Sequence, residues 1–106
     1  MVFNTGAALL DAIVLAVVSR TEEGTYGYKI TQDVRETIEV SESTLYPVLR
    51  RLQKDGCLEV YDRQYDGRNR RYYKVTLVGR EKLDMYRTEW KQYTNKINQL
   101  FAGGEK

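Results

Sequence analysis

The segment from Val40 to Val78 constrains this chain more than any other part of its 106 residues. It opens with residues that start a helix, continues as an amphipathic helix with cations on one side, and stops at Asp55-Gly56. Two short runs typical of strands follow, on either side of an arginine-rich turn. A helix that can enter a groove, followed by a basic hairpin, is a layout suited to holding DNA.

The helix of this segment has two distinct faces. Ser41 or Ser43 can cap its first backbone N–H groups, and Pro47 predicts that regular helix begins near Ser43 or that the first turn is distorted. The inward stripe consists of Leu45, Val48, Leu49 and Leu52. The outer side consists of Ser43, Tyr46, Pro47, Arg50 and Lys54, with Arg51 on a flank.

The hairpin is predicted from alternating apolar and polar residues. Leu58 and Val60 begin the first strand, residues 65–69 form the turn, and the return strand runs from Arg71 to Leu77. One face of the return strand carries Tyr73, Val75 and Leu77, and the other carries Tyr72, Lys74 and Thr76.

Two further helices are expected earlier in the chain, from about Thr5 to Arg20 and from about Tyr26 to Ile38. The first is apolar on almost all sides, so we expect it to be buried in the core or against a partner chain. Asp11 interrupts it and is expected at the helix start or on its one exposed stripe. Three helices followed by a hairpin predict a mainly α (α+β) chain with a winged helix-turn-helix.

This arrangement assigns chemistry to particular side chains. Hydroxyls near the start of the third helix can donate to DNA phosphates, aided by the positive helix N-terminus, and the cations of its outer side can reach bases or backbone. Arginines at the tip of the hairpin can enter the adjacent minor groove, where the negative potential favours them. The predicted DNA-binding residues are Ser43, Thr44, Tyr46, Arg50, Arg51, Lys54, Arg68, Asn69, Arg70 and Arg71.

A last helix is expected from about Val78 to Phe101, followed by a loose Gly103-Gly104 tail. Its large apolar residues alternate in spacings of three and four, which is the seam of a coiled coil: Leu83, Tyr86, Trp90, Tyr93, Ile97 and Leu100. The aromatics of the seam can be core residues against the first helix, or the last helices of two subunits can pair.

We favour pairing, because a short chain has little core left to cover six large residues and because small DNA readers commonly dimerise. The chain then divides into a DNA-binding domain at 1–78 and a dimerisation helix and tail at 79–106. A flat apolar slot beside Trp90 and Tyr86 would accept a planar aromatic effector.

Composition limits the other classes of function. The sequence has no histidine and a single cysteine, Cys57, which excludes an internal disulfide and argues against zinc sites and histidine-based catalysis. No converging nucleophile, base or metal set is visible, so neither an enzyme nor a cofactor is expected. The N-terminal apolar run is too short to span a bilayer, and a cytoplasmic protein is expected. The net charge is only +2, but cations clearly outnumber acids from Arg50 to Arg80.

The chain resembles the PadR family of bacterial transcriptional regulators, in its short-form branch with a single C-terminal dimerisation helix. The resemblance covers nearly the whole chain and rests on several short motifs. These are Tyr26-Gly27-Tyr28-Lys29-Ile30, Ser43-Thr44-Leu45-Tyr46-Pro47 with Leu49 and Arg51-Leu52, then Gly56, Gly67, Arg70-Arg71-Tyr72-Tyr73, Val75-Thr76 and Gly79-Arg80.

The resemblance implies a homodimeric winged-helix repressor that binds a palindromic operator and that, in some members, is released by small phenolic or aromatic compounds. Some short-branch members bind flat aromatic drugs between paired tryptophans, and Trp90 is the matching position. Thr94 stands one turn beyond, where an acidic partner for such drugs is not evident. The alternative function is a winged-helix protein-interaction module that does not bind DNA.

Overall fold

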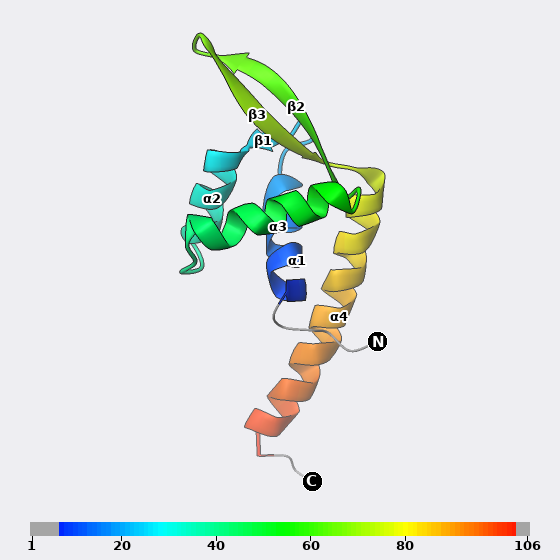
Figure 1. The fold of residues 1–106 in the computed structure, drawn as a ribbon. Coiled ribbons are helices and arrows are strands. Elements are labelled where there is room, and N and C mark those ends of the chain that lie inside the picture. Colours follow the sequence, from blue (N-terminus) through cyan, green and yellow to red (C-terminus); the bar gives the residue numbers. More distant parts are fainter. Residues whose placement is uncertain (1–6, 104–106) are drawn as a thin grey trace.

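The computed structural model describes residues 7–103 as four helices and a small antiparallel sheet (Figure 1). In chain order the elements are α1 (Ala7–Val18), β1 (Thr25–Tyr26), α2 (Gly27–Arg35), α3 (Glu42–Lys54), β2 (Leu58–Tyr65), β3 (Arg68–Val75) and α4 (Leu77–Phe101). The predicted winged helix-turn-helix with a long C-terminal helix is therefore confirmed. The predicted start of the first helix at Thr5 lies outside the described residues, as does Gly104 of the predicted tail.

Strands β2 and β3 form a hairpin, the wing, whose turn is tighter than the sequence predicted. Tyr65 pairs with Arg68, which leaves only Asp66 and Gly67 between the strands. Both of these residues have positive φ angles, 57° and 79°, as a two-residue hairpin turn requires. The prediction of a turn over residues 65–69 was wrong, because the Asp-Gly pair closes the hairpin and places the basic residues on strand β3.

The two-residue strand β1 was not predicted, and it joins α2 to the wing. It adds a third strand in the order β1-β3-β2, with Thr25 opposite Tyr73 and Tyr26 opposite Tyr72. Gly24, with φ 92°, precedes it, and a Cβ there would lie 2.2 Å from the carbonyl oxygen of Tyr73. Helix α2 consequently begins at Gly27 and ends at Arg35, so the predicted helix from Tyr26 to Ile38 was too long.

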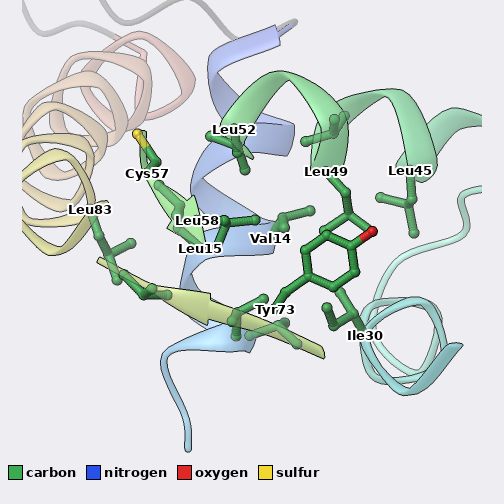
Figure 2. Packing of buried hydrophobic residues seen from close by; sticks show 14 of the residues in the cluster. Val14, Leu15, Ile30, Leu45, Leu49, Leu52, Cys57, Leu58, Tyr73 and Leu83 are labelled. Atoms are coloured by element: carbon green, nitrogen blue, oxygen red, sulfur yellow. The ribbon is translucent and has the colours of Figure 1, made fainter. Parts of the chain in front are cut away.

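The core lies between α1, α3 and the sheet (Figure 2). The predicted inward stripe of α3 is confirmed, because Leu45, Val48, Leu49 and Leu52 are all buried. Val14 and Leu15 of α1 are buried in the same cluster. This packing fixes which face of α3 points outward.

Asp11 is buried, with 5% of its surface exposed, and the prediction of an exposed stripe or helix start was wrong. Its carboxylate accepts a hydrogen bond from the guanidinium of Arg51 in α3. The Tyr86 hydroxyl of α4 lies 3.5 Å from the other carboxylate oxygen. A buried charge is tolerated when it is paired in this way.

Helix α4 begins at Leu77, so Leu77 belongs to this helix and not, as the sequence predicted, to the preceding strand. The Thr76 side chain caps the helix by accepting a hydrogen bond from the Gly79 N–H at 3.0 Å, and it donates to the Gly56 carbonyl at 2.6 Å. Leu77 is 73% exposed, so its predicted place on an apolar strand face was wrong. The cap fastens the start of α4 to the chain just after α3.

Helix α4, with 25 residues, is the longest element of the described chain. Its first half runs beside α1, and its second half continues past the end of α1 (Figure 1). The molecule measures 62 × 27 × 20 Å, and its radius of gyration of 15.8 Å exceeds the roughly 13 Å of a compact chain of about this length. Among the described residues, no helix has the length and apolar character needed to cross a membrane.

Candidate nucleic-acid interface

The start of α3 presents a small cluster of hydroxyl groups. Ser41 is the N-cap, and its side-chain oxygen accepts a hydrogen bond from the Thr44 N–H at 3.2 Å. The same oxygen lies 3.0 Å from the Ser43 hydroxyl and 2.9 Å from the Thr44 hydroxyl. Ser43 and Thr44 are exposed, so their hydroxyls stand at the positive end of the helix, where an anion is favoured.

Ser41→Ala is expected to destabilise the protein by about 1 kcal/mol, because the Thr44 N–H loses its cap. Urea unfolding monitored by circular dichroism measures this change. Ser43→Ala is the matched control, because Ser43 belongs to the same cluster but does not cap the helix. Equal losses in the two variants would contradict the assignment of Ser41 as the cap.

The outer face of α3 is largely as predicted. Ser43, Pro47, Arg50 and Lys54 are exposed, and Tyr46 is half-buried. Helix α3 begins at Glu42, one residue before the predicted start near Ser43, and Pro47 lies inside the helix rather than in its first turn. It has no N–H to donate to the carbonyl of Ser43, so one backbone hydrogen bond of the helix is not made.

Arg51 differs from its neighbours on α3. Its side chain is 40% exposed and is paired with Asp11 of α1, so its guanidinium is directed toward the inner helix. Sequence spacing placed Arg51 on a flank, and the structure shows that this flank faces a buried carboxylate. Contact between Arg51 and DNA stays a prediction.

Tyrosine and arginine side chains alternate along one face of the wing. The guanidinium of Arg70 lies 4.5 Å from the ring centre of Tyr26 and 4.8 Å from that of Tyr65. That of Arg63 lies 5.3 Å from the ring centre of Tyr72. Such cation–π contacts hold the planar cations in place before any ligand arrives.

The opposite face of the wing looks toward α3. Because side chains alternate along a strand, Asn69 and Arg71 share the face that carries Tyr73, while Arg68 and Arg70 share the other. Burial raises the pKa of the Tyr73 hydroxyl, and the positive charges of Arg71 and of Arg50 in α3 oppose that rise. The positive charges of the wing and of α3 therefore both lie close enough to Tyr73 to influence its pKa.

A hollow of about 450 Å³ lies where the wing, α3 and the start of α2 meet. Tyr46 from α3 and the arginines at positions 68, 70 and 71 line it, together with Gly27 and Tyr28 at the beginning of α2. An added Cβ on Gly27 would lie 3.5 Å from the Tyr46 ring and 3.6 Å from the Tyr73 ring. Half of the predicted DNA-binding side chains, namely Tyr46, Arg68, Asn69, Arg70 and Arg71, thus border one concave, positively charged region.

Two residues that line this region, Tyr26 and Tyr28, were not predicted as binding candidates, and neither was Arg63, which lies on strand β2 of the wing. Tyr26 and Tyr28 were noted only as part of a motif, since their place beside the wing depends on strand β1. Arg63 pairs across the hairpin with Arg70. A two-residue turn at Asp66-Gly67, read from the sequence, would have given that register.

The predicted seam of α4 divides into two parts. Leu83 and Tyr86 are buried in the core of the single chain. The alternative interpretation, in which seam aromatics are core residues against the first helix, therefore holds for Tyr86. The other four seam residues keep exposed surface, and among them Trp90 is 44% and Leu100 71% exposed. An apolar groove of about 380 Å³ between α1 and α4 is lined by Ile13, Ala16, Tyr86 and Trp90, among others.

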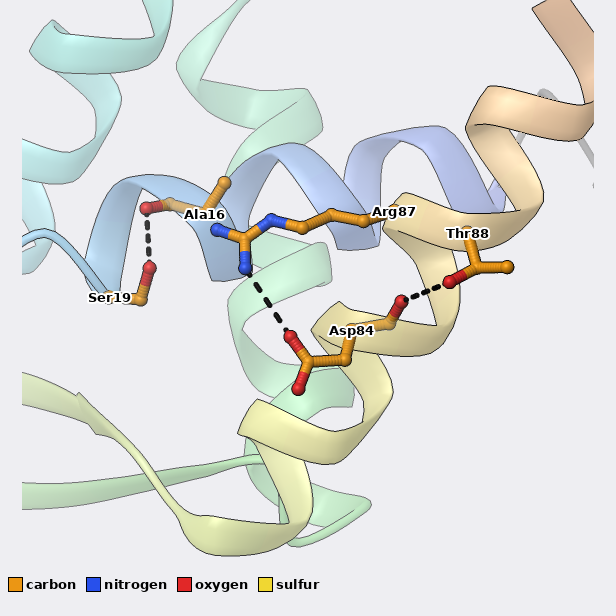
Figure 3. Close-up of polar contacts among 5 residues, drawn as sticks. All are labelled: Ala16, Ser19, Asp84, Arg87 and Thr88. Carbon is orange, nitrogen blue, oxygen red and sulfur yellow. Dashed lines mark hydrogen bonds and ion pairs between the residues drawn. The ribbon is translucent and has the colours of Figure 1, made fainter.

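Polar contacts mark one edge of this groove. Arg87 of α4 lines the groove and is paired with Asp84 at 3.4 Å, one turn earlier on the same helix (Figure 3). The Asp84 carbonyl accepts a hydrogen bond from Thr88 at 3.2 Å, and on α1 the Ala16 carbonyl accepts one from Ser19 at 2.8 Å. The groove is thus an apolar strip with a cation at its margin.

Comparison with known proteins gives consistent matches over most of the chain. The sequence model of the transcriptional regulator PadR-like family matches residues 14–85. The transcriptional regulator Rv3488 of Mycobacterium tuberculosis is 38% identical over 81 residues, covering 76% of this chain and 72% of that protein.

Solved structures extend the likeness to the whole fold. The structure of smu.1704 from Streptococcus mutans has a TM-score of 0.85 and 35% identity, and the match covers all of this chain and 98% of that one. A PadR family transcription regulator from Clostridium difficile has a TM-score of 0.79 and 28% identity, with 87% and 97% of the two chains covered.

Proposed function

Since this chain belongs to the PadR-like family of transcriptional regulators, we propose that it is a homodimeric repressor that binds a palindromic operator. The observation that carries the DNA-binding part is the concave basic region shared by α3 and the wing. Helix α3 would enter the major groove, with Arg50 and Lys54 on the side that meets it. The wing arginines would follow the adjacent phosphates and minor groove.

The dimer part is supported by the far half of α4. Leu100 and Phe101 are 71% and 85% exposed there, beyond the end of α1, although both are large and apolar. The groove between α1 and α4 offers an apolar surface of complementary character on the same chain. If α4 of a second copy packs along this groove, one twofold contact would bury both the exposed end of α4 and the apolar groove. Twofold symmetry of the protein in turn favours a palindromic site.

The effector part is supported by the same groove. Its volume of about 380 Å³ is in the range of small-molecule sites, and Trp90 and Tyr86 provide flat apolar surface. In a dimer formed along α4, a planar aromatic compound would lie against Trp90 and change how the two subunits are held. Release of the operator by such a compound is the mode of action that we propose.

Changing Arg70→Ala together with Arg71→Ala tests DNA binding. Affinity for a duplex selected from a random pool by the wild-type protein is expected to fall about tenfold to a hundredfold, because the proposed dimer loses four cations near phosphates, two from each wing. The slope of log affinity against log salt should flatten by roughly 4, since fewer counterions are released. Fluorescence anisotropy at several salt concentrations measures both quantities.

The matched control is Lys91→Ala with Lys96→Ala, which removes the same charge from the far half of α4, away from the wing (Figure 1). This control should keep the wild-type salt slope. Equal slopes in all three proteins would remove the wing from the interface. A wild-type protein that binds no duplex even at low salt would favour the protein-interaction module instead.

A further inference from the structure

The buried carboxylate of Asp11 connects three helices at one point. Asp11 lies on α1 and contacts Arg51 of α3 through one oxygen and Tyr86 of α4 through the other. Among the described residues, the other buried polar side chain is Thr31, whose hydroxyl is satisfied within α2 by the Tyr28 carbonyl at 2.8 Å. Asp11 is therefore the one buried ionic group of the described core, and its partners come from distant parts of the chain.

On one side, Asp11 fixes the position of a side chain on the recognition helix. A carboxylate holds a guanidinium in a defined plane, and Arg51 is adjacent in sequence to Arg50 on the outer face. Arg51 keeps 40% of its side chain exposed, so the N–H groups that Asp11 does not use can reach a ligand. The orientation of Arg51 toward DNA therefore depends on where Asp11 stands.

On the other side, Asp11 meets the groove. The ring of Tyr86 lines the apolar groove together with Trp90, while its hydroxyl approaches Asp11. The distance of 3.5 Å is at the outer limit of a hydrogen bond, so a movement of α4 by a fraction of an ångström along α1 would form or break it. Burial raises the pKa of Tyr86, which keeps its hydroxyl protonated and able to donate, while Lys82, one turn earlier on α4, also contacts the Tyr86 side chain and opposes that rise.

We propose that Asp11 is a positioning residue that couples the groove between α1 and α4 to recognition helix α3 through Tyr86 and Arg51. A molecule or partner helix in the groove changes the Tyr86 contact, and the change reaches Arg51 through a single carboxylate. Coupling between two binding sites is reciprocal, so DNA held by α3 alters the surroundings of the groove in return. The inference rests on the proposed function, because it needs α3 to bind DNA.

Trp90 provides the measurement, since it is the single tryptophan of the chain and lines the groove. Its emission is followed while the selected duplex is added to saturation, at a fixed protein concentration at which sedimentation gives one oligomeric state. Wild-type emission is expected to change on binding. In Tyr86→Phe and in Asp11→Asn, that change should fall by at least half. The DNA affinity of each variant is measured in parallel, so that the emission changes are compared at saturation in every case.

The matched control is Asp84→Asn, which neutralises an exposed carboxylate on α4 that is paired with Arg87 at the same groove. It should keep the full Trp90 response. The proposal is overturned if saturating DNA leaves wild-type emission unchanged, or if both variants respond as the wild type does. Tyr86→Phe keeps the ring, so it gives an answer even if Asp11→Asn does not fold. Failure of the proposed function is seen separately, as absence of binding in the anisotropy titration.

Discussion

Gly79→Ala is expected to destabilise the protein by about 2–3 kcal/mol, although alanine is the better helix former. A Cβ at this position would lie 2.2 Å from the carbonyl oxygen of Cys57 and 2.9 Å from a methyl group of Val75. Cys57 and Val75 are both buried, so neither can move aside easily. The midpoint of urea unfolding measures the loss.

Val78→Ala is the matched control, because Val78 is the preceding residue of the same helical turn and is 53% exposed. Its substitution should change stability by no more than about 0.5 kcal/mol. If Gly79→Ala were as stable as the control, α4 could not be held as closely against the end of α3 as the structure shows. That contact sets the direction in which α4 leaves the rest of the fold.

Changing Leu100→Ser together with Phe101→Ser is expected to convert the proposed dimer to a monomer. These residues are 71% and 85% exposed at the end of α4, and they offer apolar surface that a second copy could bury. A monomer loses the second half-site, and its affinity for a palindromic duplex should fall about a hundredfold, because the second contact is no longer intramolecular. Sedimentation gives the mass, and anisotropy gives the affinity.

Leu77→Ser with Val78→Ser is the corresponding control at the other end of α4. Both residues are large, apolar and exposed, yet they lie at the start of the helix beside the wing and not beyond α1. This variant should remain a dimer. A wild-type monomer at micromolar concentration, or dissociation caused equally by both pairs, would contradict pairing through the far half of α4.

The sequence was sufficient to predict helix α3, the hairpin and the long last helix, because each has a strong local signal. The inward residues of α3 recur at helical spacing, and Ser41 and Gly56 mark its two ends. The residues on the opposite side of the helix could therefore be predicted to face solvent. For the same reason, the predicted exposure of Arg50 and Lys54 agrees with the structure.

The errors at Asp11, at strand β1 and on the α4 seam have a common physical origin, which is that these features depend on contacts between distant segments. Nothing near Asp11 in the sequence indicates that Arg51, 40 residues later, will neutralise it. Strand β1 has only two residues and exists because β3 lies beside it. Leu83 and Tyr86 continue the pattern of the α4 seam, but α1 covers them within the same chain. A periodic pattern shows that a face is apolar and does not show what covers it.

The register of the wing has a consequence for how its length can vary between related proteins. Removing one residue pair would exchange the two faces, so that Arg71 would no longer point toward α3. Removing two pairs would keep every side chain on its own face and shorten the hairpin by about 7 Å. Insertions and deletions that preserve the arrangement should therefore occur in multiples of two pairs, and the depth to which the tip reaches along a duplex should change in discrete steps.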